Sequence, residues 1–256
     1  MNKLFVAMQD EASRRWAPVA RLTREADQYR FVYTRGCQKM PEFEAFGRFT
    51  DLRAEYVSNE LFPLFANRVL PRVRPEYGRY LSWLGLSDAD AFEELSRTGG
   101  LRATDGLELI PCPEPTEDRR YEIRFFTRGL RHLSAGCQAA IDQLRVGERL
   151  YLTRDVQNHV DAMALMLRTA DPVRLVGYVP RYYSVDITRL LKRAGADAVA
   201  VRVEGVNPDA PLHYRLRCRL TAPWPEGFVA CADPEFQPIA KGPKDHRSER
   251  GIAQAV

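Results

Sequence analysis

Two stretches specify most of the second half of the chain: GERLYLTRDVQNHVDAMAL at positions 147–165 and LVGYVPRYYSVDI at positions 175–187. In the first, apolar residues alternate with polar ones on both sides of a polar loop, which is the pattern of two half-buried strands. In the second, an apolar run leads into helical spacing that begins at Ser184 and stops at Gly195. We therefore predict a helix after three strands, around 150–153, 163–167 and 175–179.

The sequence on both sides of these stretches adds elements of the same kind. A small barrel of short strands with accompanying helices is the simplest architecture that buries them all, and we assign it to residues 121–228. The additional elements that we expect are a strand over 121–127, a helix from Ser134 to about Arg145, and closing strands over 198–203 and 214–220.

Proline-rich sequence marks the boundaries of this domain. The sequence PCPEPTED at 111–118 has three prolines within five residues, which neither a helix interior nor a central strand tolerates. We place a linker at 113–120. From Val229 the chain is polar, contains three further prolines and shows little periodicity, so residues 229–256 are predicted to be a disordered tail.

Residues 1–112 are predicted to form a separate domain of mixed structure. Apolar residues alternate in three runs within the first 35 residues, which indicates an antiparallel meander. Helical spacing follows from Asp51 to Pro71, then over 77–84, and then around Phe92 and Leu95. The predicted fold class is therefore α+β, with a meander and three helices followed by a small β-barrel with helices.

Composition and charge indicate a globular protein with an anionic partner. Of 256 residues, 45% are hydrophobic, which suffices for a sizeable core and excludes collagen-like and disordered chains. The net charge of +4 is concentrated in residues 119–193, where fourteen Lys and Arg face seven Asp and Glu. All but one of these cations are arginine, whose flat guanidinium suits phosphate groups and aromatic rings. The pattern favours nucleic acid as a partner.

The residue sets that usually mark an enzyme are missing from the sequence. It contains no dinucleotide-binding glycine motif, Walker A sequence, nucleophile elbow or zinc-protease motif. Its five cysteines and four histidines lack the spacing of metal ligands, so we expect no metal, no cofactor and no enzymatic activity. Asp155 and Asp161 flank one loop and are the remaining pair for metal-dependent DNA hydrolysis, although acids at such positions are usually turn formers.

Membrane and export signals are also missing from the sequence. No apolar stretch approaches the roughly 20 residues that span a bilayer. The start, MNKLFVAMQD, lacks the apolar core and the cleavage site of a secretory signal. We therefore expect a cytoplasmic location and no membrane contact.

The two stretches quoted above resemble the HIRAN domain, and so does the sequence RFFTRGLRH at 124–132. The shared pattern is a strand, a loop ending in Asn-x-x-Asp, a second strand, and a Val-Gly-Tyr-Val-Pro-Arg strand that runs into a helix. The resemblance covers about residues 121–220. It implies an OB-like barrel that captures the 3′ end of single-stranded DNA, found alone in bacteria and attached to fork-remodelling helicases in eukaryotes.

The resemblance also implies roles for individual residues. Residues 124–126 match the basic-aromatic-aromatic segment that touches the terminal nucleotides. Asp161 matches the acid that hydrogen-bonds the free 3′ hydroxyl. Tyr178 lies where the end of the DNA is contacted, and Arg181 lies where a basic residue meets phosphate.

The chain departs from the family pattern beside that acid. Val160 stands where an aromatic residue is common, and Met163 stands where Asn is common. Two tyrosines after Arg181 would supply the missing stacking. With the neighbouring arginines, the candidate DNA-binding residues are Arg124, Phe125, Phe126, Arg128, Arg154, Asp161, Tyr178, Arg181, Tyr182 and Tyr183.

Physical reasoning supports binding at a strand end. A single strand needs a basic groove for phosphates and exposed rings for bases. An acid such as Asp161 repels phosphate unless it faces a hydroxyl, which a chain end provides. Purely structural alternatives stay open for these residues. Neighbouring strand residues point to opposite faces, so one of the two phenylalanines faces the core, and either one could serve packing alone. The corresponding alternatives for the other residues are that Asp161 only fixes its own loop, that residues 181–183 only precede a helix as a cap, and that the arginines only keep the surface soluble.

Residues 1–118 are similar to the N-terminal subdomain of HipA-type toxin kinases. The similar segments are LFPLFANRVLP at 61–71, YLSWLGLS at 80–87 and AFEELSRTGG at 91–100, with a departure at LRATDG, 101–106. In that family this piece packs on a kinase core and helps to dock a DNA-binding antitoxin. The chain has no kinase core, so the similarity implies either an interaction platform or a module that stabilises its neighbour.

These observations predict a non-enzymatic DNA-binding protein. Its HIRAN-like domain would grip single-stranded DNA, preferably at 3′ ends, while residues 1–118 recruit a protein partner, in DNA repair or mobile-element defence. The alternative is a toxin-antitoxin-like regulator, in which the HipA-N-like domain binds a separate kinase or helix-turn-helix protein and DNA contact is incidental.

Overall fold

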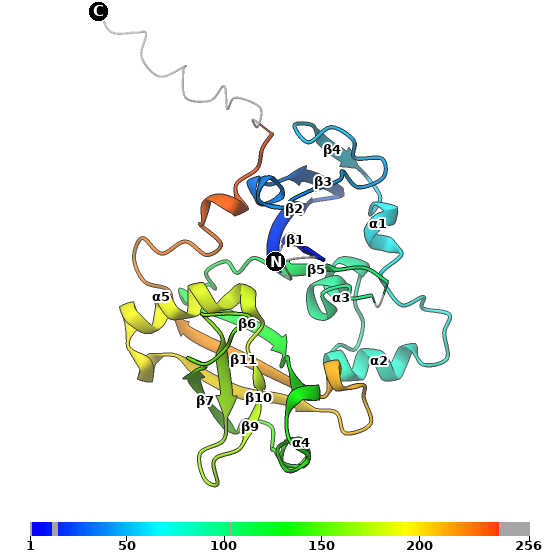
Figure 1. Cartoon of the computed structure of the whole chain (residues 1–256). Helices are drawn as coiled ribbons and strands as arrows, with labels where there is room; N and C mark the ends of the chain where they lie inside the picture. Colours follow the sequence, from blue (N-terminus) through cyan, green and yellow to red (C-terminus); the bar gives the residue numbers. More distant parts are fainter. Residues whose placement is uncertain (1, 12–14, 103, 241–256) are drawn as a thin grey trace, which may run out of the picture.

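The structure is a computed structural model that describes residues 2–11, 15–102 and 104–240, and these form two antiparallel sheets (Figure 1). The first sheet contains the predicted meander, and a later strand joins it beside the first one. Side chains alternate along β1 (Lys3–Gln9), so Leu4 and Val6 are buried in one cluster and Phe5 and Ala7 are buried in another on the opposite face. Across this sheet lie β4 (Glu55–Ser58), β3 (Gln28–Tyr33), β2 (Trp16–Glu25), β1 (Lys3–Gln9) and β5 (Leu107–Pro111).

The second sheet curls into a half-barrel whose outer strands meet at one point. There the backbone N–H groups of Arg128 and Tyr178 donate to each other's carbonyl oxygens, at 2.8 and 2.9 Å. The strands agree with the predicted ones to within three residues at each end, while OB-like closure stays a prediction. Across the sheet lie β6 (Arg120–Phe126), β11 (Leu216–Pro223), β10 (Ala200–Val206), β7 (Arg149–Arg154), β8 (Leu165–Arg168) and β9 (Leu175–Tyr178).

Short helices accompany both sheets. In α3, Asp90 accepts a hydrogen bond from the N–H of Glu93, which caps the first turn, and Gly99 ends the helix at φ +73°. This helix lies where the two sheets meet, beside β5 and β6 (Figure 1). Within the described residues the α-helices are α1 (Pro63–Ala66), α2 (Tyr77–Leu84), α3 (Ala91–Thr98), α4 (Ala135–Ile141) and α5 (Ser184–Ala194).

The helix predicted between Asp51 and Pro71 is wrong for most of its length. Residues 55–58 form β4 and pair with β3 instead. The ring of Tyr56 lies 5.0 Å from that of Phe49 and anchors the strand in the aromatic core. Pro63 inside the segment cannot occupy a helix interior, so a helix starts only there and lasts one turn, as α1. Helical spacing of apolar residues did not exclude a loop with a short strand.

The two halves of the chain share a hydrophobic core. Residues 112–119 connect β5 to β6, at the position of the predicted linker. Phe5 and Ile110 from the first sheet belong to the same buried cluster as Tyr183 and Ile187 from the half-barrel side. The sheets are therefore held in a fixed relation by apolar contact, and a surface between them can serve as a site.

The prediction of a disordered tail from Val229 is wrong for residues 229–240, which pack against the first sheet. Phe236 packs edge-on against Phe5, with ring centroids 4.8 Å apart. The backbone N–H of Ile239 donates to the Tyr33 carbonyl at 2.9 Å, so the segment lies beside the end of β3. A few isolated apolar residues hold it without any periodicity. The rest of the predicted tail, 241–256, lies outside the described residues.

Candidate functional site

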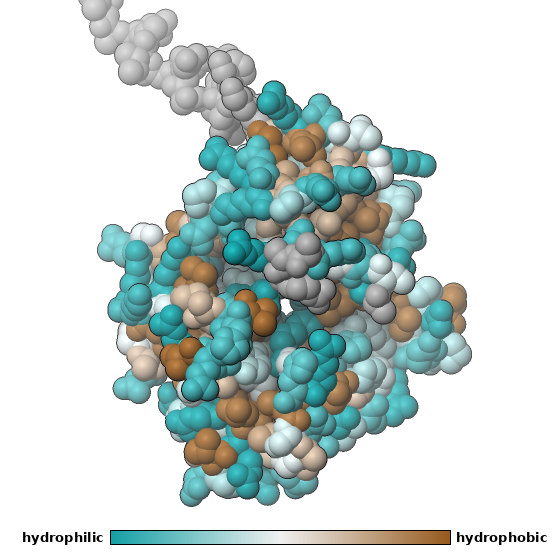
Figure 2. All heavy atoms as spheres, in the orientation of Figure 1, coloured by the Kyte–Doolittle hydropathy of each residue, from teal (hydrophilic) through white to brown (hydrophobic). Residues whose placement is uncertain are grey.

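A cleft of about 840 Å³ lies between the first sheet and the half-barrel. The space-filling view shows the surface hollowed between the two halves (Figure 2). Three residues of the first half line it, namely Gln9, Trp16 and Glu108. The half-barrel side contributes cations, rings and one loop acid, among them Arg128, Arg131, Asn158, Asp161, Tyr178, Arg181, Tyr182 and His213.

Glu108 on β5 ties the two walls of the cleft together. Its side chain is buried, and one carboxylate oxygen forms an ion pair with Arg128. The other oxygen accepts a hydrogen bond from the Tyr182 hydroxyl at 3.2 Å. The Tyr182 ring in turn meets Trp16 edge-on, with centroids 5.7 Å apart. Burial raises the pKa of Tyr182 well above its ordinary value, so its hydroxyl is a neutral donor.

The loop after β7 is held by a chain of side-chain hydrogen bonds. The Tyr178 hydroxyl donates to Asp155 Oδ2 at 2.9 Å, and Asn158 Nδ2 donates to the same oxygen at 3.1 Å. These two bonds lower the pKa of Asp155. Asn158 Oδ1 accepts the backbone N–H of Asp161 at 2.8 Å, which fixes where that acid lies.

Asp161 uses one of its two carboxylate oxygens inside the loop. Oδ1 accepts the backbone N–H of Met163 at 2.9 Å, as the structural alternative proposed. Within the described residues, Oδ2 has no hydrogen-bond partner, and the residue lines the cleft. The side chain therefore stabilises its loop and also presents an acceptor to a ligand.

Two arginines of the cleft are free of acidic partners among the residues that the structure describes. Arg181 has no side-chain hydrogen bond or ion pair there, and Arg131 donates only to His132, from Nε to Nε2 at 3.0 Å. Burial, followed by the charge of Arg128, lowers the pKa of His213. His213 is therefore neutral at pH 7, and the cleft's available positive charge comes from Arg131 and Arg181.

Removing the Tyr178 hydroxyl tests this description of the loop. In Tyr178→Phe we expect the pKa of Asp155 to rise towards its ordinary value, because its first hydrogen-bond donor is lost. A depressed carboxyl pKa contributes stability above the ordinary pKa that disappears as pH falls through the folded-state value. The stability difference from the wild-type protein should therefore vanish in acid. An NMR titration of the Asp155 carboxyl measures the shift, and an unchanged pKa would contradict the assigned bond.

Half of the predicted site residues lie in the cleft, namely Arg128, Asp161, Tyr178, Arg181 and Tyr182. Three of the others are buried: Phe125 and Tyr183 in the core of the half-barrel, and Phe126 against α2. The prediction that these three rings stack on bases is therefore wrong, because all three are buried. Both phenylalanines are buried, on opposite faces of β6, because α2 covers the outer face there.

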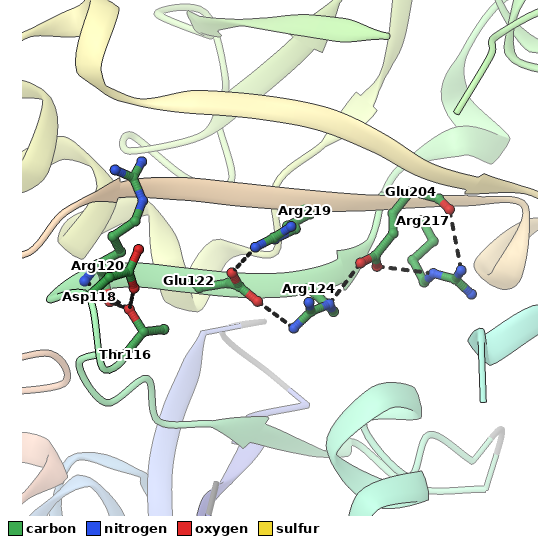
Figure 3. A network of polar contacts seen from close by, with 8 residues as sticks. All are labelled: Thr116, Asp118, Arg120, Glu122, Arg124, Glu204, Arg217 and Arg219. Atoms are coloured by element: carbon green, nitrogen blue, oxygen red, sulfur yellow. Dashed lines mark hydrogen bonds and ion pairs between the residues drawn. The ribbon is translucent and has the colours of Figure 1, made fainter. Parts of the chain in front are cut away.

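Arg124 and Arg154 also lie outside the cleft. Arg124 points from the outer face of β6 into a network with Glu122 and Glu204, and its Nε is 2.7 Å from Glu204 Oε1 (Figure 3). Arg154 is exposed at the end of β7 and donates to the Ala162 carbonyl at 3.3 Å. The first arginine is engaged by acids, and the second supports the loop that carries Asp161.

Sequence reasoning missed the contribution of the first sheet. Trp16 and Glu108 lie in strands far from the recognised motif, and nothing in their local sequence distinguishes them from core residues. Arg131 carried a signal, because it stands in the arginine-rich segment close to Arg128. In residues 2–11, 15–102 and 104–240, His, Cys, Asp and Glu form no group suited to a metal ion. No helix of the described chain has the length and apolarity to cross a membrane.

Comparisons with known proteins show that the second half of the chain is similar to one domain family. The model of the HIRAN domain matches residues 121–224, which cover the half-barrel. Two solved structures are similar to 40% of this chain. One, of a protein from Lactobacillus plantarum, is 20% identical with a TM-score of 0.32 and 96% of its own chain covered. The other, the HIRAN domain of human HLTF, is 14% identical with a TM-score of 0.30 and 74% covered. None of the curated proteins matches the chain.

Proposed function

We propose that the HIRAN domain at residues 121–224 makes this chain a DNA-binding protein, and that the cleft holds the end of a single strand, preferably a 3′ end. HIRAN domains are generally DNA-binding modules, which supports the general class. One observation carries the finer proposal: Asp161 lies in the same cleft as Arg131 and Arg181, with an oxygen free to accept a hydrogen bond. Phosphates are attracted by the arginines, and a terminal hydroxyl satisfies the acid.

The rings of the cleft suit the terminal base. Trp16 and Tyr182 are partly exposed and come from different sheets, so a base can stack where they meet. Base stacking on aromatic rings contributes about 1–3 kcal/mol per base. Val160, exposed beside the acid, offers only apolar contact. In this proposal the first sheet supplies part of the DNA site, in addition to any role in binding proteins.

The proposal is tested by fluorescence anisotropy at low salt with three oligonucleotides. They are a single strand with a free 3′ hydroxyl, the same strand with a 3′ phosphate, and a blunt duplex. We expect the first to bind more tightly than the second. Equal binding of both single strands would contradict end capture. No binding of any oligonucleotide would contradict DNA binding altogether, because phosphate contacts are strongest at low salt.

Arg181→Ala should weaken binding of every single strand, whatever its 3′ group, because Arg181 is assigned to a phosphate. The slope of log affinity against log salt should fall by about 0.7, the value for one lost contact on a single strand. Arg48→Ala is the matched control, since that arginine is exposed in the first half of the chain and does not line the cleft. Equal effects of the two substitutions would contradict the assignment.

We further propose a binding role without catalysis for the whole chain, in the cytoplasm, in DNA repair or mobile-element defence. Residues 1–118 would then also recruit a protein partner, as the similarity to HipA-type N-terminal subdomains suggests. An adjacent helicase or nuclease gene would favour this setting. An adjacent kinase or helix-turn-helix gene would favour the toxin-antitoxin-like alternative.

A further inference from the structure

Four arginines lie directly opposite one another on the outer face of the half-barrel. Arg124 on β6 pairs with Arg219 on β11, Arg219 pairs with Arg202 on β10, and Arg202 pairs with Arg149 on β7. We call these four residues the arginine row. Directly opposed residues of antiparallel strands share one face of the sheet. Their neighbours along the strands, such as Val201 and Leu220, are buried in the core, so the arginines point outward.

Such a row is costly for the fold alone, because like charges directly opposite each other destabilise a sheet. Acids offset the charge at one end only. Glu122 forms ion pairs with both Arg124 and Arg219, as Figure 3 shows, and Glu204 also binds Arg124. At this end the guanidinium groups are largely satisfied.

The other end of the row is uncompensated. Within the described part of the chain, neither Arg202 nor Arg149 forms an ion pair, and both are exposed. Arg202 donates to the Gly147 carbonyl at 2.8 Å. Arg149 lies over the ring of Tyr151 at 5.4 Å, and Arg168 lies over the same ring at 5.1 Å. Two cations, on β7 and β8, therefore lie over one tyrosine, and Arg202 on β10 lies directly opposite the first of them.

We propose that the arginine row, together with Arg168, is a second DNA-binding surface that takes the phosphate backbone of duplex DNA. Strands in a sheet are about 4.8 Å apart, so four of them span about 14 Å. That matches the axial length of about four phosphate-to-phosphate steps on one strand of a duplex. Planar guanidinium groups bind phosphate oxygens in pairs. The inference rests on the proposed function for the nature of the ligand and concerns a face separate from the cleft.

The test compares two double variants with the wild-type protein on a blunt duplex. Arg149→Gln/Arg202→Gln removes the uncompensated end of the row. Arg48→Gln/Arg53→Gln removes the same charge from exposed positions before β4. We expect about tenfold weaker duplex binding for the first and less than about twofold for the second. The salt slope of the first should fall by about 1.8, the value for two lost contacts on a duplex. Equal effects of the two variants would overturn the proposal.

A variant that should bind duplex DNA more tightly shows whether weaker binding of the other variants comes from damage to the fold. Glu122→Gln frees Arg219 and leaves Arg124 with Glu204 as its one acid, so duplex binding should become tighter, which a damaged fold cannot produce. Unchanged or weaker binding would count against the row. Short single strands with a 3′ hydroxyl should bind all these variants like the wild type. If the row variants weaken duplex binding but no single strand binds, only the cleft proposal is overturned. If single strands bind but the row variants leave duplex binding unchanged, only the proposal for the arginine row is overturned.

Discussion

Phe126→Ala is expected to lower the free energy of unfolding by about 3–5 kcal/mol, the usual cost of removing a buried phenylalanine ring. The side chain is only 4% exposed and packs with Tyr80, Leu81 and Leu84 of α2. It also meets Tyr214 at a centroid distance of 5.2 Å. The ring therefore joins the half-barrel to the first half of the chain. Urea denaturation, followed by far-UV circular dichroism, measures the loss.

Phe126→Leu is the control, because it keeps most of the apolar volume and should cost less than about 1.5 kcal/mol. Both variants should retain most of the DNA affinity under conditions where they are folded. If the sequence-based role were right, Phe126→Ala would weaken DNA binding and leave stability nearly unchanged. That outcome would contradict the packing described above.

Asp161→Ala should weaken binding of a single strand with a 3′ hydroxyl by roughly 10- to 150-fold. This corresponds to the 1.5–3 kcal/mol of a hydrogen bond to a charged group. Binding of the same strand with a 3′ phosphate should not weaken, because the carboxylate repels that phosphate and makes no favourable contact with it. The ratio of the two affinities, measured by anisotropy, is the quantity to follow.

The loop role of Asp161 requires a second variant. Asp161→Asn keeps an oxygen for the backbone N–H of Met163, so the loop geometry should survive while the charge is lost. We expect it to lose part of the preference for the 3′ hydroxyl while its stability stays close to that of the wild type. If the preference survives in both variants, Asp161 is only a loop residue and end selection lies elsewhere.

Local sequence predicted much of the half-barrel and part of the cleft. Strand alternation located β6 to β11, because each strand buries one face whatever its partners are. Asp161, Tyr178 and Arg181 lie in the recognised motif itself, where the loop, the strand and the helix start are neighbours in sequence. Their presence in one cleft follows from contacts that span a few dozen residues.

The rest depends on contacts between distant parts of the chain. Which face of β6 is exposed is set by α2, about forty residues earlier in the sequence, so the sequence around Phe126 did not indicate its burial. Glu108 and Trp16 reach the cleft only because the two sheets share a core. Arg124 had the right residue type for phosphate, but its acids come from its own strand and from β10.

The most direct test of end capture is a competition between a linear single strand and the same sequence closed into a circle. Both carry the same bases and nearly the same phosphate charge, but only the linear strand has a hydroxyl for Asp161. We predict that the linear strand displaces a labelled 3′-hydroxyl oligonucleotide at a concentration at least about tenfold lower than the circle, as expected for one charge-assisted hydrogen bond. Equal displacement by the two strands would contradict the account, because the cleft would then bind the strand along its length.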